Sequence, residues 1–294
     1  ANLRDVRDNL PLHLACQGDC PLEIVAALIR AYPAGPTCKN IYGNLPIHSA
    51  AASVHSETLQ VIKLLLAVYP VGAMTPNKTG VLPLHFHVGM EGATLPVTLA
   101  LLESYPKGVE MKDVNGHLAL HWAVMHDSKP PMDITFSRGR PPPSSQPVVT
   151  SVYNAYPEAV KIWDVEGNLA LHCAAVDNAS LDVLEMLIEA YPEAAGARNL
   201  AGQTPLDLAR KIKRVDEEDE QECYAMLEDA ATAVPETDVV PNSEITANRL
   251  NQMRARVERV DMNKESRVVV AMAEQSLHVR SADHVDLSEL TMVL

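Results

Sequence analysis

Histidine returns at one position of a repeated phrase in this sequence, and histidine is the side chain most often found as a metal ligand or acid–base catalyst. The phrase is a turn-forming pair, then Leu or Thr, Pro or Ala, an aliphatic residue and His. Its histidines are His13, His48, His85, His121 and His172. They are 35, 37, 36 and 51 residues apart, and Asp207 takes the same position 35 residues later. A fixed period of this length is typical of stacked supersecondary units.

The repeated histidines are too far apart to share a metal ion. Helices of neighbouring units in a stack lie about 8–10 Å apart, whereas zinc holds each imidazole nitrogen at about 2 Å. We therefore interpret each ring as structural, with one nitrogen donating and the other accepting a hydrogen bond between adjacent turns. The alternative is a metal site in which His87 or His126 completes a pair.

Other catalytic signatures are absent from the sequence. It contains no Gly-x-Ser-x-Gly, no Gly-x-x-x-x-Gly-Lys-Ser/Thr and no Gly-x-Gly-x-x-Gly pattern. Its five cysteines form no Cys-x-x-Cys pair, which indicates reduced thiols and no zinc knuckle. We predict no catalytic, cofactor-binding or metal-binding residue, and therefore a protein that is not an enzyme and needs no cofactor.

Two short helices follow each turn of the repeat. In the fifth copy the histidine lies in a helix that starts at 169, and residues 180–190 form a second helix with apolar residues every three or four positions. A Tyr-Pro pair then ends the second helix, because proline cannot donate the next hydrogen bond. We expect each of these tyrosines to pack against its own second helix rather than form an exposed ladder. An Asp or Asn that nucleates the next turn stands three residues before the Gly position, at Asp5, Asn40, Asn77, Asp113, Asp164 and Asn199.

The repeated phrase resembles the Thr-Pro-Leu-His-x-Ala signature of the ankyrin-repeat family. Thr204-Pro205-Leu206-Asp207 keeps its first three residues, while Leu replaces Thr in the five other copies and Ala replaces Pro in two. Tyr-Pro also replaces the family's usual Gly-Ala after the second helix. The resemblance covers residues 3–231 and implies an all-α fold, an α-solenoid of six stacked helix-turn-helix repeats with short finger loops.

The period divides the chain into an array and an extension. We predict an ankyrin-repeat array over 1–231, with a proline- and serine-rich insertion at 127–146 that forms a solvated loop or, alternatively, a peptide ligand. Residues 232–294 form a C-terminal extension with one amphipathic helix near 243–260, and we expect poor order in the remainder. The predicted repeats are 3–37, 38–74, 75–110, 111–161, 162–196 and 197–231.

Composition restricts the partners and the compartment. The net charge of −14 argues against nonspecific binding to nucleic acid or anionic membranes, which require an excess of Lys and Arg. No apolar run reaches the roughly 18 residues of a membrane span, and no signal peptide is evident. We expect an intracellular monomer, in the cytoplasm or nucleus, whose partner is another protein. Because the sequence begins with Ala1 rather than Met, it is compatible with a fragment of a longer protein.

Positions where the repeat departs from its own pattern are candidates for partner contact, because the stack does not need them. The resemblance implies that the residue after the histidine faces the inner groove, where Phe86 and Trp122 would be neighbours. Trp163 lies one residue before the Asp/Asn column. Large aromatic side chains dominate the energy of interfaces, so we predict that these three residues contact a partner. The alternative is that both indoles fill gaps around the insertion.

A mostly basic row occupies the same position as Trp163 in other copies. Lys39, Lys112 and Arg198 belong to it and indicate an acidic feature on the partner. The sequence therefore predicts a non-catalytic scaffold or adaptor that binds another protein through its concave groove. The alternative is a regulatory or targeting module of a larger enzyme, such as a kinase or ubiquitin ligase. A third hypothesis, inhibition of a transcription factor, rests on analogy and the acidic end of the chain.

Overall fold

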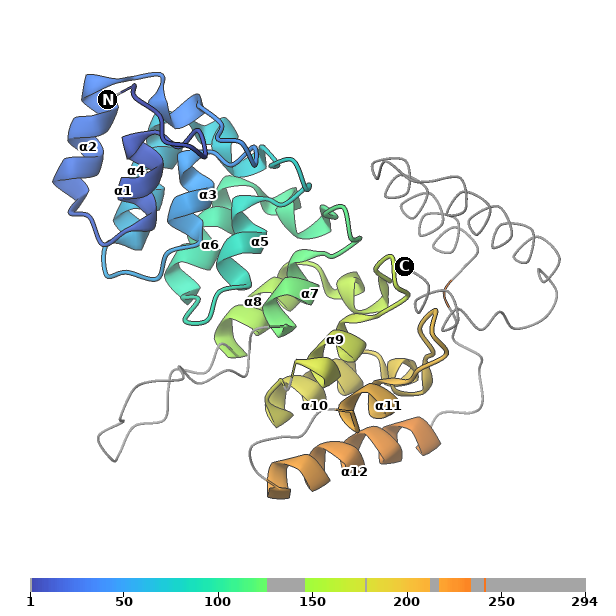
Figure 1. Ribbon diagram of the computed structural model, residues 1–294. Coiled ribbons are helices and arrows are strands. Elements are labelled where there is room, and N and C mark those ends of the chain that lie inside the picture. Colours follow the sequence, from blue (N-terminus) through green and yellow to red (C-terminus); the bar gives the residue numbers. More distant parts are fainter. Residues whose placement is uncertain (1, 126–145, 178, 212–216, 234–240, 242–294) are drawn as a thin grey trace, which may run out of the picture.

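All regular elements in the computed structural model are helices, within residues 2–125, 146–177, 179–211, 217–233 and 241 that it describes. They follow one another along a stack from α1 to α12 (Figure 1). This confirms the all-α helical-repeat fold, while the repeat boundaries stay predictions. The pairs are α1 Pro11–Gln17 with α2 Leu22–Ala31, α3 Pro46–Ala51 with α4 Thr58–Val68, α5 Pro83–Val88 with α6 Leu95–Ser104, α7 Ala119–Val124 with α8 Gln146–Ala155, α9 Ala170–Val176 with α10 Leu181–Ala190, and α11 Pro205–Ala209 with α12 Glu217–Ala233.

Two predicted segments fall mostly outside this description. The insertion at 127–146 lies outside the described residues except for Gln146, the first residue of α8. The amphipathic helix expected near 243–260 lies outside them entirely. Among the described residues, no helix combines the length and apolar character needed to cross a membrane.

The first helix of each pair begins at the repeated phrase. Its Leu is the N-cap residue in extended conformation, and the histidine three residues later accepts the backbone N–H of that Leu at Nδ1, as in Leu45 and His48 at 3.1 Å. In the last pair, Thr204 and Asp207 exchange the two bonds of a capping box at 3.0 and 3.2 Å. The histidine and Asp207 thus perform the same local task, which explains why they share a position.

The Tyr-Pro pairs do more than end the second helices. Each pair leads into a short 3-10 helix. Four of the five begin at the proline directly after the tyrosine, because its fixed φ suits a first helical position, whereas η1 begins at Gly35, three residues after Tyr32. The tyrosines are half-buried, and their rings lie against this 3-10 helix: a Cβ built on Gly72 would lie 3.2 Å from the Tyr69 ring. The 3-10 helices are η1 Gly35–Thr37, η2 Pro70–Met74, η3 Pro106–Glu110, η4 Pro157–Lys161 and η5 Pro192–Gly196.

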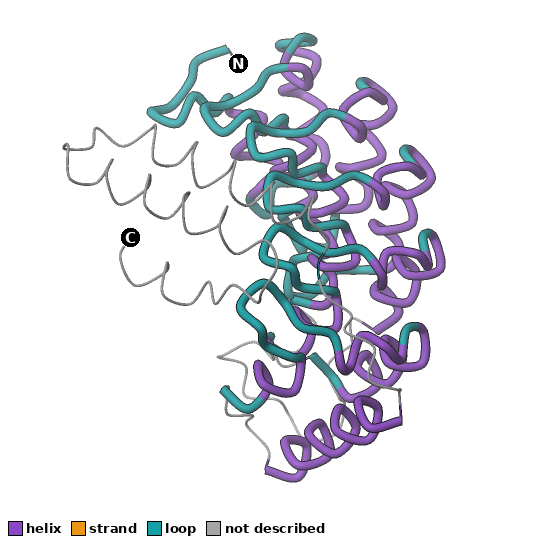
Figure 2. The backbone as a smooth tube through the Cα atoms, turned by 90° about the vertical axis from the view of Figure 1, so that its right-hand side faces the viewer, coloured by secondary structure: helices purple, strands orange, loops and turns teal. Residues whose placement is uncertain are grey.

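The turns before the first helices line one edge of the stack (Figure 2). The Asp or Asn of each turn accepts two backbone N–H groups, as Asn40 Oδ1 does from Tyr42 and Asn44 at 2.9 and 3.0 Å. The Gly three residues later has a positive φ, 80° at Gly43. Each turn also donates a backbone N–H to the preceding one, as Ile41 does to Arg7 O at 3.1 Å. The predicted turn chemistry is confirmed, and it connects neighbouring units directly.

One continuous apolar core runs along the stack. It contains a leucine or isoleucine from each of the first five helix pairs, in the residue before the histidine, and Leu120 is fully buried there. Burying a side chain of this size stabilises the fold by about 1.5–3 kcal/mol. At the far end, α12 buries Cys223 and Leu227 against this core and exposes acidic residues such as Glu228.

Candidate functional site

Four of the five repeated histidines bond their own helix start through Nδ1 and the following unit through Nε2. Because Nδ1 accepts the N–H of its own N-cap residue, the neutral ring carries its proton on Nε2 and donates it. Each acceptor is a backbone carbonyl oxygen of the following unit, 3.0 to 3.3 Å away. The bonds are His13 to Asn44 O, His48 to Val81 O, His85 to Met111 O and His172 to Ala197 O. This confirms the structural interpretation of these rings.

The alternative of a metal site receives no support from His87. Its Nδ1 and Nε2 contact the backbone carbonyl oxygens of Ala51 and Thr94 at 3.2 and 3.1 Å, so both ring nitrogens already have protein partners. His126 lies outside the described residues. Within the residues that the structure does describe, no three His, Cys, Asp or Glu side chains are arranged to hold a metal ion.

Burial lowers the reactivity of the repeated histidines and of two thiols. It lowers the pKa of His48, His85 and His172 to about 4, so these rings are neutral at neutral pH. Burial also raises the pKa of the Cys16 thiol to about 12 and that of Cys173 well above its usual value. A thiol held in its protonated form is a poor nucleophile.

His121 departs from the other repeated histidines. It is fully buried, and its Nδ1 accepts the Leu118 N–H at 3.2 Å, but its Nε2 has no hydrogen-bond partner among the described residues. Burial lowers its pKa to about 4. Among the described residues, the junction between the fourth and fifth helix pairs therefore lacks the histidine-to-carbonyl hydrogen bond.

A cluster of charged side chains lies at the same junction, and we call Asp113, His117 and Asp164 the Asp-His-Asp cluster. His117 Nδ1 is 3.5 Å from Asp113 Oδ2, and its Nε2 is 3.3 Å from Asp164 Oδ2. Burial alone would lower the pKa of His117, but hydrogen bonds and charge from the two carboxylates outweigh it and raise that pKa to about 9. Burial likewise opposes ionisation of both aspartates, yet their contacts with His117 and backbone N–H groups keep their pKa values low. The sequence analysis did not single out this cluster, although an unusual His in the turn column marks it.

Phe86 and Trp122 lie side by side, as expected from the residue position after the histidine. Their ring centroids are 6.4 Å apart at 48°, and both side chains are half-buried. Trp122 Nε1 donates to Asp113 Oδ2 at 3.3 Å, and the indole covers Gly89, where a Cβ would lie 2.6 Å from Trp122 Cε3. We call Phe86 and Trp122 the aromatic pair; the indole is held by the third helix pair and by the Asp-His-Asp cluster.

Trp163 lies apart from the aromatic pair. Its half-buried ring packs 6.2 Å from the ring of His172, and its backbone carbonyl accepts Lys112 Nζ at 3.4 Å. The three predicted aromatic contacts therefore divide into a pair and a separate indole on the next turn.

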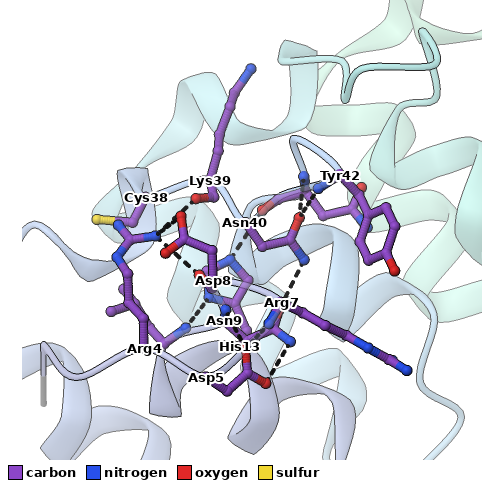
Figure 3. A network of polar contacts seen from close by, with 12 residues as sticks. Arg4, Asp5, Arg7, Asp8, Asn9, His13, Cys38, Lys39, Asn40 and Tyr42 are labelled. Carbon is purple, nitrogen blue, oxygen red and sulfur yellow. Dashed lines mark hydrogen bonds and ion pairs between the residues drawn. The ribbon is translucent and has the colours of Figure 1, made fainter.

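The basic row makes contacts that the sequence analysis missed. Lys39 Nζ donates to Pro76 O at 3.2 Å, which repeats the Lys112 contact with the next turn two units earlier. Arg4, at the same position of the first turn, donates to Lys39 O at 3.1 Å (Figure 3). Arg198 donates within its own turn, to Gly202 O at 2.8 Å. All of these cationic side chains remain exposed, so the basic row links turns and still presents positive charge to solvent.

Comparisons with known proteins agree with this architecture. The family model for the ankyrin repeat matches residues 7–41. No curated protein matches the chain. Among solved structures, similarity extends to a chain from the complex of the Bd0816 predatory endopeptidase of Bdellovibrio bacteriovorus with immunity protein Bd3460. The TM-score is 0.54 at 18% sequence identity, and the match covers 77% of this chain and 99% of that one. At this identity the likeness shows the fold alone.

Proposed function

Because the chain is an ankyrin-repeat protein, we propose that it is a non-catalytic scaffold or adaptor. Ankyrin repeats are interaction modules, so the coarse function is binding to another protein. The finer proposal is that the aromatic pair and the basic row form the contact surface, with Trp163 on the neighbouring turn.

The observation that carries the proposal is the placement of the aromatic pair. Phe86 and Trp122 are half-buried side by side, so a partner that covers them would remove a large rigid apolar area from water with little loss of side-chain entropy. Exposed cations at Lys39, Lys112 and Arg198 favour a partner that brings carboxylates to this edge. The bound partner is therefore expected to place an apolar side chain on the pair and acidic residues along the turns.

The absence of catalysis is part of the proposal and has its own support. Most groups suited to chemistry are already engaged: four of the five repeated histidines donate to backbone carbonyls, and burial keeps Cys16 and Cys173 protonated. The alternative, a regulatory module of a larger kinase or ubiquitin ligase, differs only in what is attached to the array. A catalytic domain in the complete reading frame would favour it.

The proposal is tested by affinity capture from cells of the source organism with matched variants. Trp122→Ala should reduce affinity for the captured protein about 30-fold, as expected for a hot-spot residue worth about 2 kcal/mol. Leu99→Ala is the control, because Leu99 is an exposed apolar residue on a second helix, α6. Trp122→Phe keeps an aromatic ring over Gly89 and separates lost contact from lost folding. Capture by Trp122→Ala equal to that by the control, with an unchanged circular dichroism spectrum, would overturn the proposed surface.

A further inference from the structure

Neutral amide hydrogen bonds connect most successive turns in the described residues. Where the turn residue is Asn, it donates from Nδ2 to the last turn residue of the preceding unit. An amide side chain has both donors and an acceptor. The Asn that accepts this bond can therefore also donate to a carboxylate of its own turn, as Asn9 does to Asp5 at 3.0 Å. The links are Asn40 to Asn9, Asn77 to Asn44 and Asn199 to Asn168, at 2.8, 2.9 and 2.9 Å.

This amide chemistry fails at the junction of the fourth and fifth helix pairs. Asp113 and Asp164 occupy both turn positions, and their side chains are 1% and 2% exposed. Carboxylates only accept hydrogen bonds, so an Asn between them would direct its carbonyl oxygen at one of them. The residue in that place is His117, and an imidazolium has a donor on each nitrogen. The geometry therefore requires a charged histidine between two buried acids.

Other groups around His117 complete its environment. His121 on α7 is 5.8 Å away between ring centroids, and the charge of His117 also reaches His85 on α5. Burial lowers the pKa of His121 and of His85, so both remain neutral. Lys112 lies in the same turn, with its Nζ on Trp163 O. The Trp122 indole meets the His117 ring edge-on at 6.5 Å and 85°. Both approach the same oxygen, Asp113 Oδ2: the indole donates to it, and His117 Nδ1 lies 3.5 Å from it.

We propose that His117 is a positioning residue whose positive charge fastens the fourth helix pair to the fifth and holds the Trp122 indole on the interaction surface. Partner binding then depends on the protonation of one ring outside the contact surface. This last consequence rests on the proposed function, whereas the fastening and the placement of Trp122 do not.

The pKa shifts of the Asp-His-Asp cluster determine how its contribution to stability changes with pH. The pKa of His117 is raised to about 9, so its contribution to stability is complete below the unfolded value near 6.5 and is lost as pH rises through about 9. The pKa values of Asp113 and Asp164 are lowered, so their contribution is present above about 4 and is lost as pH falls through the lowered values. The cluster is intact over the neutral range and weakens on the alkaline side first.

A double-mutant cycle tests the fastening. His117→Asn removes the ring between the two buried carboxylates, and Asp164→Asn removes one of the two carboxylates beside that ring. Each variant should therefore have a lower midpoint of urea unfolding at pH 7. The double variant recreates the Asp5, Asn9 and Asn40 arrangement of the first turns and should recover most of the loss. Strictly additive losses in the double variant would overturn the pairing.

Two spectroscopic titrations test the positioning of Trp122. The His117 ring proton resonance should titrate near pH 9 and move toward 6.5 in Asp164→Asn. In a Trp163→Phe background Trp122 is the sole tryptophan, and its fluorescence maximum should shift with the same midpoint. A constant emission maximum across the His117 titration would overturn the positioning role. Failure of Trp122→Ala to affect partner capture, with these titrations as expected, would instead reject only the proposed function.

Discussion

Acidification from pH 7.5 to pH 5 is the perturbation to which this fold should respond most strongly. Burial lowers the pKa of His48, His85, His121 and His172 to about 4, whereas histidine in an unfolded chain titrates near 6.5. Between these values the unfolded chain binds more protons than the folded one. The free energy of unfolding must therefore fall as pH falls through this window.

The size of the effect follows from the shifts. One pKa unit corresponds to about 1.36 kcal/mol, so each of these rings costs about 2 kcal/mol at pH 5. Four independent rings would cost about 8 kcal/mol, comparable with the whole stability of a typical domain. Near pH 5 the unfolding equilibrium should take up about three to four protons.

The assay is urea unfolding followed by circular dichroism at intervals between pH 7.5 and 4.5. A slope of about 4–5 kcal/mol per pH unit near pH 5 is expected from three to four protons. His117 adds nothing to the slope near pH 5, because at that pH it is protonated in both the folded and the unfolded chain. A free energy that changes by less than about 1 kcal/mol between pH 7.5 and 5 would refute the assignment of neutral buried rings.

A matched pair of variants separates titration from hydrogen bonding. His85→Asn and His121→Asn each keep an acceptor for the N-cap N–H and remove one titrating ring, so each should lower the proton uptake by about one. Of the two, only His85 also donates from Nε2 to the next unit, at 3.0 Å, whereas His121 Nε2 has no partner among the described residues. At pH 7.5 His85→Asn should therefore be the less stable variant by about 1 kcal/mol. Equal stability would contradict the interunit bond.

Three further predictions concern packing and reactivity. Gly89→Ala should destabilise the array by about 1–3 kcal/mol in thermal melts and shift tryptophan emission, because its Cβ would lie 2.6 Å from Trp122 Cε3. In native protein, half-buried Cys20 should react with a thiol reagent while buried Cys173 resists it. Mass spectrometry after labelling measures both, and labelling of Cys173 at the rate of Cys20 would contradict the prediction. Leu120→Ala should cost about 2–5 kcal/mol in urea unfolding, since the side chain is fully buried; a loss under 1 kcal/mol would argue against that packing.

The sequence predicted those features that depend on short-range hydrogen bonding. The repeated phrase placed the start of each first helix, because a histidine or Asp207 three residues after the N-cap satisfies a free N–H by a local rule. The Asp/Asn column predicted the turns for the same reason, since one oxygen reaches two backbone groups within four residues. The 3-10 helices were readable in principle, from proline followed by a small residue such as Gly72, but proline was interpreted only as a stop.

The sequence could not supply features that depend on how units stack. Adjacency of Phe86 and Trp122 was predictable, because both occupy the same position of consecutive units. The bond from Lys39 to Pro76 O, by contrast, crosses 37 residues and depends on the separation of two turns. Partner contact at the aromatic pair and the basic row stays a prediction, because a side chain that packs well inside one chain can also pack against another.

The junction between the fourth and fifth helix pairs shows why departures from a repeat carry more information than the repeat itself. In a stack held together by nearest-neighbour contacts, each junction contributes its own free energy. Within the part of the chain that the structure describes, His121 lacks the carbonyl bond that the other repeated histidines make, and a buried charged cluster replaces the neutral amide link. Buried ions stabilise only while every partner is present, because removing one leaves an uncompensated charge. Loss of the His117 proton on the alkaline side should therefore weaken this junction, and Trp122 is bonded to it through Asp113.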